Sequence, residues 1–322
     1  MNIVLIAEES AGIQALAALW DTGHHIVAVL ASPLKSRVPR ASVFHAATKS
    51  GLTVWPADFV KDASLAERLR AERVDLILNV HSLYLIHDEV LRAPAVGAFN
   101  LHPGPLPRYA GLNAVSWAIY RGETTHGVTL HKMVPDIDAG PIVYQVLFPI
   151  SADDTALSLS TKCVTHGLHL VRQFLALAAE APSRIPLIQQ NLSEREYFGK
   201  EVPNSGCLSW DWPAARIVNF VRACDYFPFR SPWGYPWTEC AQGKLSIMKA
   251  ARTGIACNAP PGTIGDLQGP AALVASADEW VAVEKIKLGK ACISASELLQ
   301  TGRQLCARLQ LAETSTRRPR YF

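Results

Sequence analysis

Short apolar runs alternate with amphipathic segments over the first half of the chain, and this pattern predicts a sheet covered by helices. Helical spacing of apolar residues predicts helices over Ala11–Thr22, Ala41–Ser50 and Leu65–Glu72. We expect Ser64 and Glu67 to form a capping box at the start of the third of these helices. Strands are predicted over Asn2–Ala7, His25–Ala31, Thr53–Pro56, Val74–Val80 and Gly97–Leu101. The alternation indicates an α/β fold built from βαβ units, with a Rossmann-like, mostly parallel sheet.

The same pattern continues to the middle of the chain and then stops. Two more strand-like runs, Gly127–Met133 and Ile142–Phe148, precede a long helical segment within Asp154–Ala179. These elements complete an α/β domain that we expect to span residues 1–185. The next segment, 186–205, is rich in Pro, Ser, Gln and charged residues, which predicts a linker.

The last third of the chain has a different pattern. A predicted helix near Ala214–Ala223 is followed by an aromatic, proline-rich stretch, Phe227–Trp237, and then by short strand-like runs. We therefore expect a smaller, β-rich, OB-like domain over residues 206–322. The aromatic stretch is expected either in the core of this domain or in a seam with the first domain. The strand-like runs are Leu245–Ala250, Ala272–Ser276 and Trp280–Lys285.

Composition excludes several classes of protein. Of the 322 residues, 49% are hydrophobic, which is enough to bury a sizeable core. The 31 basic and 28 acidic residues leave a net charge of +3, too small to indicate a nucleic-acid coat. No apolar run approaches the roughly 20 residues that span a bilayer, and the N-terminal sequence is unlike a signal peptide. The seven cysteines form no CxxC pair, so we expect a cytoplasmic protein without a disulfide framework.

Three polar residues beside strand ends carry the candidate chemistry. Asn100 and His102 are two residues apart and point to the same face, at the strand end where open α/β sheets bind ligands. Asp138 lies on a later loop bounded by Pro and Gly. An amide and an imidazole can stabilise an oxyanion, and a carboxylate can orient the imidazole, so the set suits acyl transfer without a covalent enzyme intermediate. On spacing alone, a turn histidine and two polar caps are the more common interpretation of these residues.

Other familiar sites are not indicated. The first strand is followed by AEESAGIQ, which is neither a GxGxxG nor a Walker loop, so nucleotide cofactors of those types are not expected. His126 and His131 lie on the strand before the Asp138 loop and point in opposite directions. Neither has a partner at metal-ligand spacing, so no metal is expected and both histidines are interpreted as structural or peripheral.

The stretch FNLHPGPLPRYAGLNAVSWAIYRGETTHGVTLHKMVPDIDAGPIVYQ (Phe99–Gln145) resembles the core of the 10-formyltetrahydrofolate-dependent formyltransferases. The resemblance lies in the N-x-H-P-x-x-L-P pattern, the HGVT-type strand and the D-x-G loop. It implies an enzyme in which Asn100, His102 and Asp138 are catalytic and 10-formyltetrahydrofolate is the formyl donor. Gly104 stands where the family usually has Ser, a difference expected to loosen loop contacts without touching the catalytic residues.

The resemblance also implies where the donor and the acceptor bind. It places the folate pocket on two loops after strands, with apolar side chains to pack on the flat pterin ring and free backbone groups to bond its edge. On the rigid proline-rich loop, Arg108 and Tyr109 are candidate substrate contacts. The folate-pocket residues are Leu83, Tyr84, Leu85, Ile86, Val134, Pro135, Asp136 and Ile137.

The acceptor amine is less closely indicated than the donor. Gly111–Thr129 and Asn191–Gly199 resemble formyltransferases acting on amino acids or carrier-bound aminoacyl groups, which makes a small-molecule amine or an aminoacyl carrier protein the expected partner. A nucleotide-linked amino sugar is the first alternative. A tRNA acceptor is disfavoured because Ser32–Ser42 is short and carries only three basic residues. A non-catalytic folate-binding module is the remaining alternative, and a homodimer is compatible with each.

Overall fold

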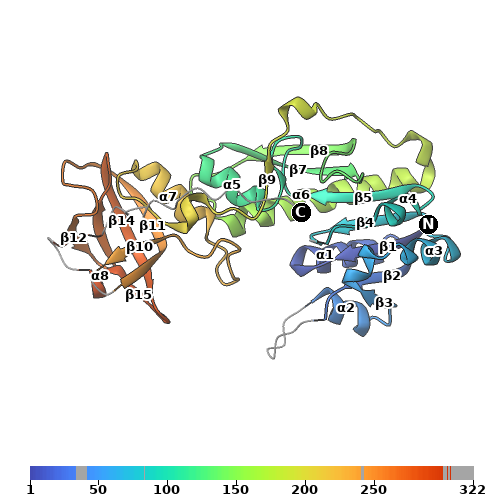
Figure 1. Ribbon diagram of the computed structural model, residues 1–322, viewed down its shortest axis with the longest axis horizontal. Helices are drawn as coiled ribbons and strands as arrows, with labels where there is room; N and C mark the ends of the chain where they lie inside the picture. The colour runs from blue at the N-terminus through green and yellow to red at the C-terminus, as the bar shows by residue number, and fades with distance from the viewer. Residues whose placement is uncertain (34–41, 83, 241–242, 300–302, 304, 306–322) are drawn as a thin grey trace, which may run out of the picture. The chain divides into compact units, whose positions relative to one another are not determined.

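The computed structural model describes residues 1–33, 42–82, 84–240, 243–299, 303 and 305. It divides into two compact units. Unit 1 comprises residues 1–118 and 123–200, and unit 2 comprises residues 119–122 and 201–322. The first unit runs from blue to yellow-green in Figure 1, and most of the second runs from yellow to red.

Unit 1 contains a seven-stranded sheet in the order β3-β2-β1-β4-β5-β7-β8. The first five strands of the chain are parallel, whereas β7 and β8 are antiparallel to their neighbours. The strand order reverses between β1 and β4, as in doubly wound sheets. The strands are β1 (Asn2–Ala7), β2 (His25–Ala31), β3 (Val54–Pro56), β4 (Leu76–Val80), β5 (Gly97–His102), β7 (Thr125–Lys132) and β8 (Ile142–Pro149).

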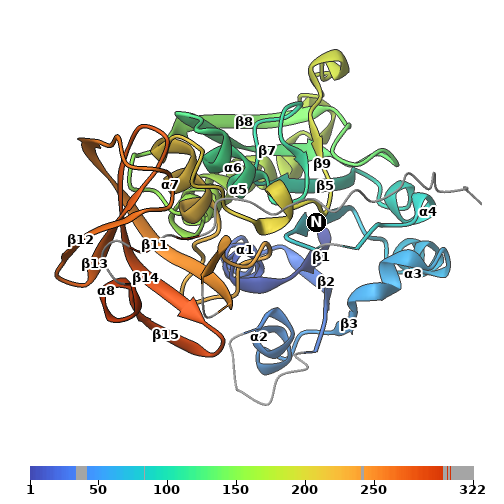
Figure 2. The same cartoon turned by 60° about the vertical axis from the view of Figure 1, so that its left-hand side comes forward.

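Helices cover both faces of this sheet (Figure 2). Helix α1 packs against α2 and α6, whereas α3 packs against α4. On one face, Val4 and Ile6 of β1 share a buried cluster with Leu65 and Leu69 of α3. The helices are α1 (Glu9–Trp20), α2 (Val43–Lys49), α3 (Ser64–Ala71), α4 (Asp88–Arg92), α5 (Ala114–Arg121) and α6 (Ala156–Glu180).

The predicted capping box before α3 is wrong. Helix α3 already includes Ser64, and its N-cap is Ala63, whose side chain makes no capping bond. The backbone N–H of Ser64 instead donates to the carboxylate of Asp62, at 2.9 Å. The residue spacing S-x-x-E was present, but Asp62 supplies the acceptor, two residues before Ser64.

The predicted linker segment folds along unit 1 as far as Lys200. Ile188 forms a bridge with Ile142 of β8, and the two-residue strand β9 (Tyr197–Phe198) pairs in parallel with β6 (Ala110–Gly111). The ring of Phe198 stacks between Tyr109 and Trp117. This pairing fixes the chain that follows β5, which is the part of the unit that carries the candidate chemistry.

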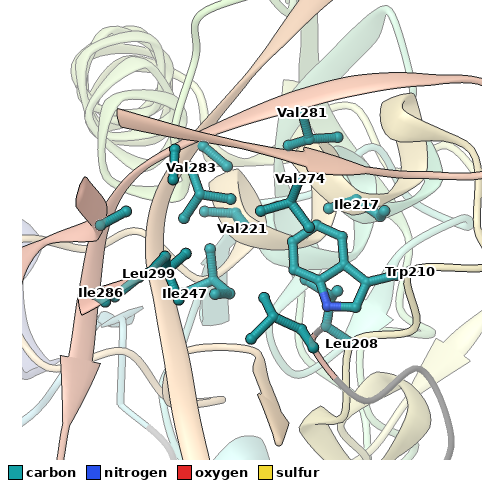
Figure 3. Packing of buried hydrophobic residues seen from close by; sticks show 14 of the residues in the cluster. Leu208, Trp210, Ile217, Val221, Ile247, Val274, Val281, Val283, Ile286 and Leu299 are labelled. Atoms are coloured by element: carbon teal, nitrogen blue, oxygen red, sulfur yellow. The ribbon is translucent and has the colours of Figure 1, made fainter. Parts of the chain in front are cut away.

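Unit 2 is a six-stranded antiparallel sheet with helix α7 (Ala214–Ala223) packed against β11 and β14. Its core holds Trp210, Ile217, Ile247 and Val283, all fully buried (Figure 3). The strands are β10 (Trp237–Cys240), β11 (Gly243–Ala256), β12 (Ile264–Gln268), β13 (Ala271–Ala275), β14 (Glu279–Leu288) and β15 (Ala291–Ser294), followed by the short helix α8 (Ala295–Leu298). The two sheets confirm the predicted fold class, a Rossmann-like α/β domain with a β-rich C-terminal domain.

The aromatic stretch before β10 is divided between burial and exposure. Trp233 is buried and meets the ring of Tyr120 edge-on, with the centroids 6.4 Å apart. Phe227 and Phe229 are exposed within the described part of unit 2. A place for the whole stretch in a seam with the first domain therefore stays a prediction.

Candidate active site

Asn100, His102 and Asp138 lie together at one end of the seven-stranded sheet. Asn100 and His102 are on β5, and Asp138 is on the loop between β7 and β8. The Nδ2 atom of Asn100 lies 3.4 Å from Oδ1 of Asp138, and Nδ1 of His102 lies 3.4 Å from Oδ2 of the same carboxylate. His102 is 3% exposed. The three side chains therefore form one cluster around a single carboxylate, with His102 buried and Asn100 and Asp138 partly buried.

The loop that carries Asp138 is held in an unusual backbone conformation. Asp138 has φ +53°, in the left-handed region that non-glycine residues rarely adopt. Its Oδ2 accepts a hydrogen bond from the backbone N–H of Gly111 at 2.8 Å. Gln190 donates to the carbonyl oxygens of Asp138 and Gly140, at 2.9 and 2.6 Å. At Gly140, a Cβ would lie 1.9 Å from the carbonyl oxygen of Lys132, so only glycine fits this end of the loop.

The environment keeps Asp138 ionised. Burial opposes ionisation, but His102, His131 and the Gly111 N–H outweigh it and hold the pKa of Asp138 well below its usual range. For the imidazole beside it, burial has the larger effect on the pKa. Burial lowers the pKa of His102, and the neighbouring Asp138 carboxylate offsets this only in part. Burial thus favours the neutral imidazole, whereas the adjacent carboxylate favours the protonated one.

The hydrogen bonds of His102 define its neutral tautomer. Nε2 lies 2.7 Å from the carbonyl oxygen of Tyr109, which can only accept, so Nε2 carries the proton. Nδ1 is then unprotonated and faces Asp138. A proton arriving at Nδ1 would lie between His102 and the carboxylate, where the resulting positive charge is stabilised.

Gly104 touches the candidate catalytic residues directly, which corrects the expectation that its difference from the family pattern leaves them untouched. A Cβ at this position would lie 2.8 Å from Nε2 of His102 and 3.0 Å from the carbonyl oxygen of Tyr109. Real Cβ atoms do not approach heavy atoms so closely. The glycine therefore leaves the space in which the bond between His102 and Tyr109 forms.

The proline-rich loop after β5 is tied to the neighbouring antiparallel strands. Thr129 of β7 donates to the carbonyl oxygen of Gly104 at 2.7 Å and accepts from the Leu106 N–H at 3.2 Å. Gln145 of β8 donates to Thr129 and to the Leu106 carbonyl oxygen, at 2.9 and 2.8 Å. These bonds use the polar groups of a buried loop and so fix the backbone around His102.

His131 belongs to the site, which corrects its interpretation as structural or peripheral. Its Nε2 lies 3.2 Å from Nδ2 of Asn100 and 3.4 Å from Oδ1 of Asp138. The signal was the pairing of strands: β7 runs antiparallel to β5 in a register that sets His131 directly opposite Asn100. His126 has no such contact, since its Nε2 donates to the Pro103 carbonyl oxygen and its ring is fully buried.

The predicted folate-pocket residues lie on the two loops that follow β4 and β7. Leu83 lies outside the described residues. Tyr84 and Ile86 are partly buried and pack against the same core cluster as Met133, at the start of the second loop. Leu85 and Ile137 are exposed, at 68% and 36%. Within the described chain, the backbone groups of Leu85, Ile86 and Val134 make no hydrogen bond; Pro135 and Asp136 are exposed beside them.

The two predicted substrate contacts are placed differently from one another. Arg108 is about half exposed and makes ion pairs with Glu123 and Glu196, at 2.7 and 3.2 Å. The ring of Tyr109 is buried, and its hydroxyl donates to Glu123 at 2.6 Å. Tyr109 therefore faces His102 through its carbonyl oxygen rather than through its ring.

Three further properties bear on the chemistry. Among the described residues, no group of three or more His, Cys, Asp or Glu side chains is placed to hold a metal ion. The six described cysteines are all free. No described helix is long and apolar enough to cross a membrane.

Several solved structures are similar to this chain at low sequence identity. An N-formyltransferase from Helicobacter canadensis is 17% identical with a TM-score of 0.66, and the match covers 88% of this chain and 97% of that one. WlaRD, a sugar 3N-formyl transferase, is 16% identical with a TM-score of 0.67, and the match covers 90% and 99%. HypX from Aquifex aeolicus is 18% identical with a TM-score of 0.60, and this chain spans 46% of its length. These likenesses establish a shared fold.

The family is established by sequence. The model described as "Formyl transferase" matches residues 1–173, more than half of the chain, and therefore includes β5, β7 and the Asp138 loop. The model described as "Formyl transferase, C-terminal domain" matches residues 202–303. The resemblance drawn from Phe99–Gln145 is thereby confirmed: the chain belongs to the formyl transferase family.

Proposed function

We propose that this protein is an N-formyltransferase that moves a formyl group from 10-formyltetrahydrofolate to the amine of a small molecule. The observation that carries the proposal is the cluster of Asn100, His102 and Asp138 in a member of the formyl transferase family. In the reaction, a bond forms between the amine nitrogen and the formyl carbon, the bond from that carbon to N10 of the folate breaks, and the amine proton ends on the leaving nitrogen.

Asn100 supplies the donor for the formyl oxygen. Nδ2 of Asn100 carries two hydrogens. One of them is directed at Nε2 of His131, 3.2 Å from Nδ2, and the other at Oδ1 of Asp138, 3.4 Å away, which is long for a hydrogen bond. The second hydrogen is therefore available to an oxygen on which negative charge develops. A donor fixed beforehand in a water-poor site stabilises that charge at little reorganisation cost.

His102 and Asp138 manage the proton. Nδ1 of His102 is the free basic atom of the cluster, because Nε2 is engaged with the Tyr109 carbonyl oxygen. The carboxylate 3.4 Å from Nδ1 stabilises the imidazolium that forms when the proton arrives. Asp138 stays ionised throughout, since its pKa is held well below its usual range.

The loops after β4 and β7 suit a pterin. Leu85 and Ile137 offer exposed apolar surface, and the backbone groups of Leu85, Ile86 and Val134 are free to bond the edge of a flat ring. Support also comes from the structural neighbours, which were crystallised with folinic acid, 5-N-formyl-THF or tetrahydrofolic acid. These residues would bind and orient the donor.

For the acceptor, the neighbours favour the nucleotide-linked amino sugar over the amino acid. The Helicobacter canadensis enzyme was crystallised with dTDP-3-aminofucose, and WlaRD with dTDP. We therefore place a sugar-nucleotide amine first. Amino-acid and carrier-bound acceptors, a homodimer and a cytoplasmic location stay predictions, and the basic residues 35, 37 and 40, which bear on tRNA, lie outside the described residues.

A panel of amines tests the proposal. The purified protein is mixed with 10-formyltetrahydrofolate and, in turn, a dTDP-linked amino sugar, free amino acids, an aminoacyl carrier protein and initiator methionyl-tRNA, and release of tetrahydrofolate is followed by absorbance. We expect release with one class of amine, the sugar nucleotide first. Folate binding without release for any amine would favour the non-catalytic binding module instead.

The same assay tests the three catalytic residues. Replacing Asn100 or His102 by Ala, or Asp138 by Asn, removes a group that acts on developing charge, so we expect kcat to fall by about 10²-fold or more. His45→Gln, at an exposed position on α2, is the control and should keep the wild-type rate. A His102→Ala protein with unchanged turnover would contradict the assignment.

A further inference from the structure

A row of three polar side chains crosses the sheet of unit 1 at a single register. Asn79 of β4 is paired with Asn100 of β5, and Asn100 is paired with His131 of β7. Asn79 is 5% exposed in a strand, LILNV, whose other residues are apolar and buried. A buried amide among apolar side chains is destabilising unless it is hydrogen-bonded, so its partner identifies its purpose.

That partner is the side chain of Asn100. Nδ2 of Asn79 donates to Oδ1 of Asn100 at 2.9 Å. Oδ1 of Asn79 is buried and has no hydrogen-bond partner among the described residues. The contact with Asn100 is therefore what the Asn79 amide contributes to the sheet.

The direction of this hydrogen bond follows from the groups on the far side of Asn100. The Asp138 carboxylate can only accept. Nε2 of His131 lies on the same side, 3.2 Å from Nδ2 of Asn100. Asn100 must therefore turn its NH₂ group toward the Asp138 carboxylate and its oxygen toward β4. Asn79 supplies the donor that this oxygen requires; without it, the oxygen would be buried and unbonded.

We propose that Asn79 is a positioning residue that fixes the orientation of the Asn100 amide. It does so from the neighbouring strand and without touching the reacting atoms. The bond to Oδ1 keeps the Nδ2 hydrogens on the side where the formyl oxygen is stabilised, and it opposes rotation of the amide. This inference rests on the proposed role of Asn100 and adds a residue that the reaction depends on indirectly.

Two replacements of Asn79 remove the donor while keeping the number of side-chain heavy atoms and the branching at Cγ. Asn79→Leu places an apolar group beside Asn100 Oδ1, and Asn79→Asp places a second acceptor there. We expect kcat to fall about tenfold in each, the loss typical of one oriented hydrogen bond, with little change in KM for the acceptor amine. Ile77→Ala, at a fully buried position two residues earlier on β4, is the matched control. It should lower the melting temperature and leave kcat unchanged.

A double-mutant cycle separates positioning from a general structural role. If Asn79 acts through Asn100, Asn79→Leu should cause no further loss of kcat in an Asn100→Ala background. Wild-type kcat in Asn79→Leu, or the same tenfold loss in both backgrounds, would overturn the proposal.

Failure of the proposed function can be distinguished from failure of the Asn79 inference. If the proposed function is wrong, the wild-type protein turns over no amine in the panel. In that case the role of Asn79 is tested by the side-chain NH₂ resonances of Asn100 in ¹⁵N–¹H spectra. Hydrogen exchange of this group should be faster in Asn79→Leu than in Ile77→Ala. Equal exchange in the two variants would overturn the inference.

Discussion

The lack of a side chain at Gly104 leads to a prediction about the His102 imidazole beside it. A Cβ at this position would meet Nε2 of His102 and the Tyr109 carbonyl oxygen, so Gly104→Ala must displace one of them. We expect the bond between His102 and Tyr109 to weaken and kcat to fall at least tenfold in steady-state kinetics. Gly23→Ala is a suitable control, since its φ of +68° makes the substitution strained but no atom lies within 4 Å of the added group. An effect on stability in both variants, with kcat unchanged in both, would contradict the role of Gly104.

The burial of His126 predicts how the stability of the protein depends on pH. Burial lowers the pKa of His126 to about 4 from an ordinary value near 6.5. Between these values the unfolded chain binds a proton that the folded protein does not bind, so stability falls as the pH drops from 6.5 to 4. The loss attributable to this residue is about 3 kcal/mol. Urea unfolding of His126→Gln across this range should show a correspondingly smaller pH dependence; the same slope as in the wild type would contradict the account.

At the scale of residues, the sequence was sufficient for groups on one strand but not for groups on neighbouring strands. Asn100 and His102 could be predicted to lie together because both are on β5. Asp138 could be assigned to the same site because its D-x-G loop resembles that of the formyltransferases. Asn79 and His131 owe their places to the register of β4, β5 and β7. Register depends on how strands pair in space, which spacing along the chain does not contain.

At the scale of elements, α6 shows the effect of a helix cap. Thr155 is its N-cap, and its hydroxyl accepts from the Ser158 N–H at 3.3 Å while Ser158 Oγ accepts from the Thr155 N–H at 2.9 Å. Thr155→Ala removes half of this reciprocal pair, and we expect a loss of about 1 kcal/mol in the free energy of unfolding. Chemical denaturation measures it, with Thr161→Ala, at an exposed position inside the same helix, as the comparison. Equal stability of Thr155→Ala and the wild type would contradict the cap.

Elements with a strong hydrophobic period were predicted well, and elements that depend on tertiary contact were not. The first five strands and α1, α2, α3 and α6 lie within a few residues of their predicted positions. The short strand β9 was not predicted, because its two residues are a strand only through pairing with β6. Gln190 and Arg195 were missed for the same reason: in a segment whose composition is typical of a linker, they bond the carbonyl groups of the Asp138 loop.

At the scale of the whole molecule, each unit has its own hydrophobic core, and the candidate chemistry lies in unit 1. The residues that hold the Asp138 loop extend to Arg195, so unit 1 needs the chain beyond α6 to complete its site. The net charge of +3 is close to neutral and is compatible with a small acceptor, whereas RNA binding is typical of strongly basic domains. The panel of amines identifies which compound accepts the formyl group.

The most direct test of the account is transfer of an isotope-labelled formyl group. The wild-type protein and Asn100→Ala are each incubated with 10-formyltetrahydrofolate carrying ¹³C in the formyl group and with a dTDP-linked amino sugar, and the product is analysed by mass spectrometry. We expect a labelled N-formyl product with the wild type, formed about 10²-fold more slowly by the variant. Label transfer at equal rates by the two proteins would contradict it.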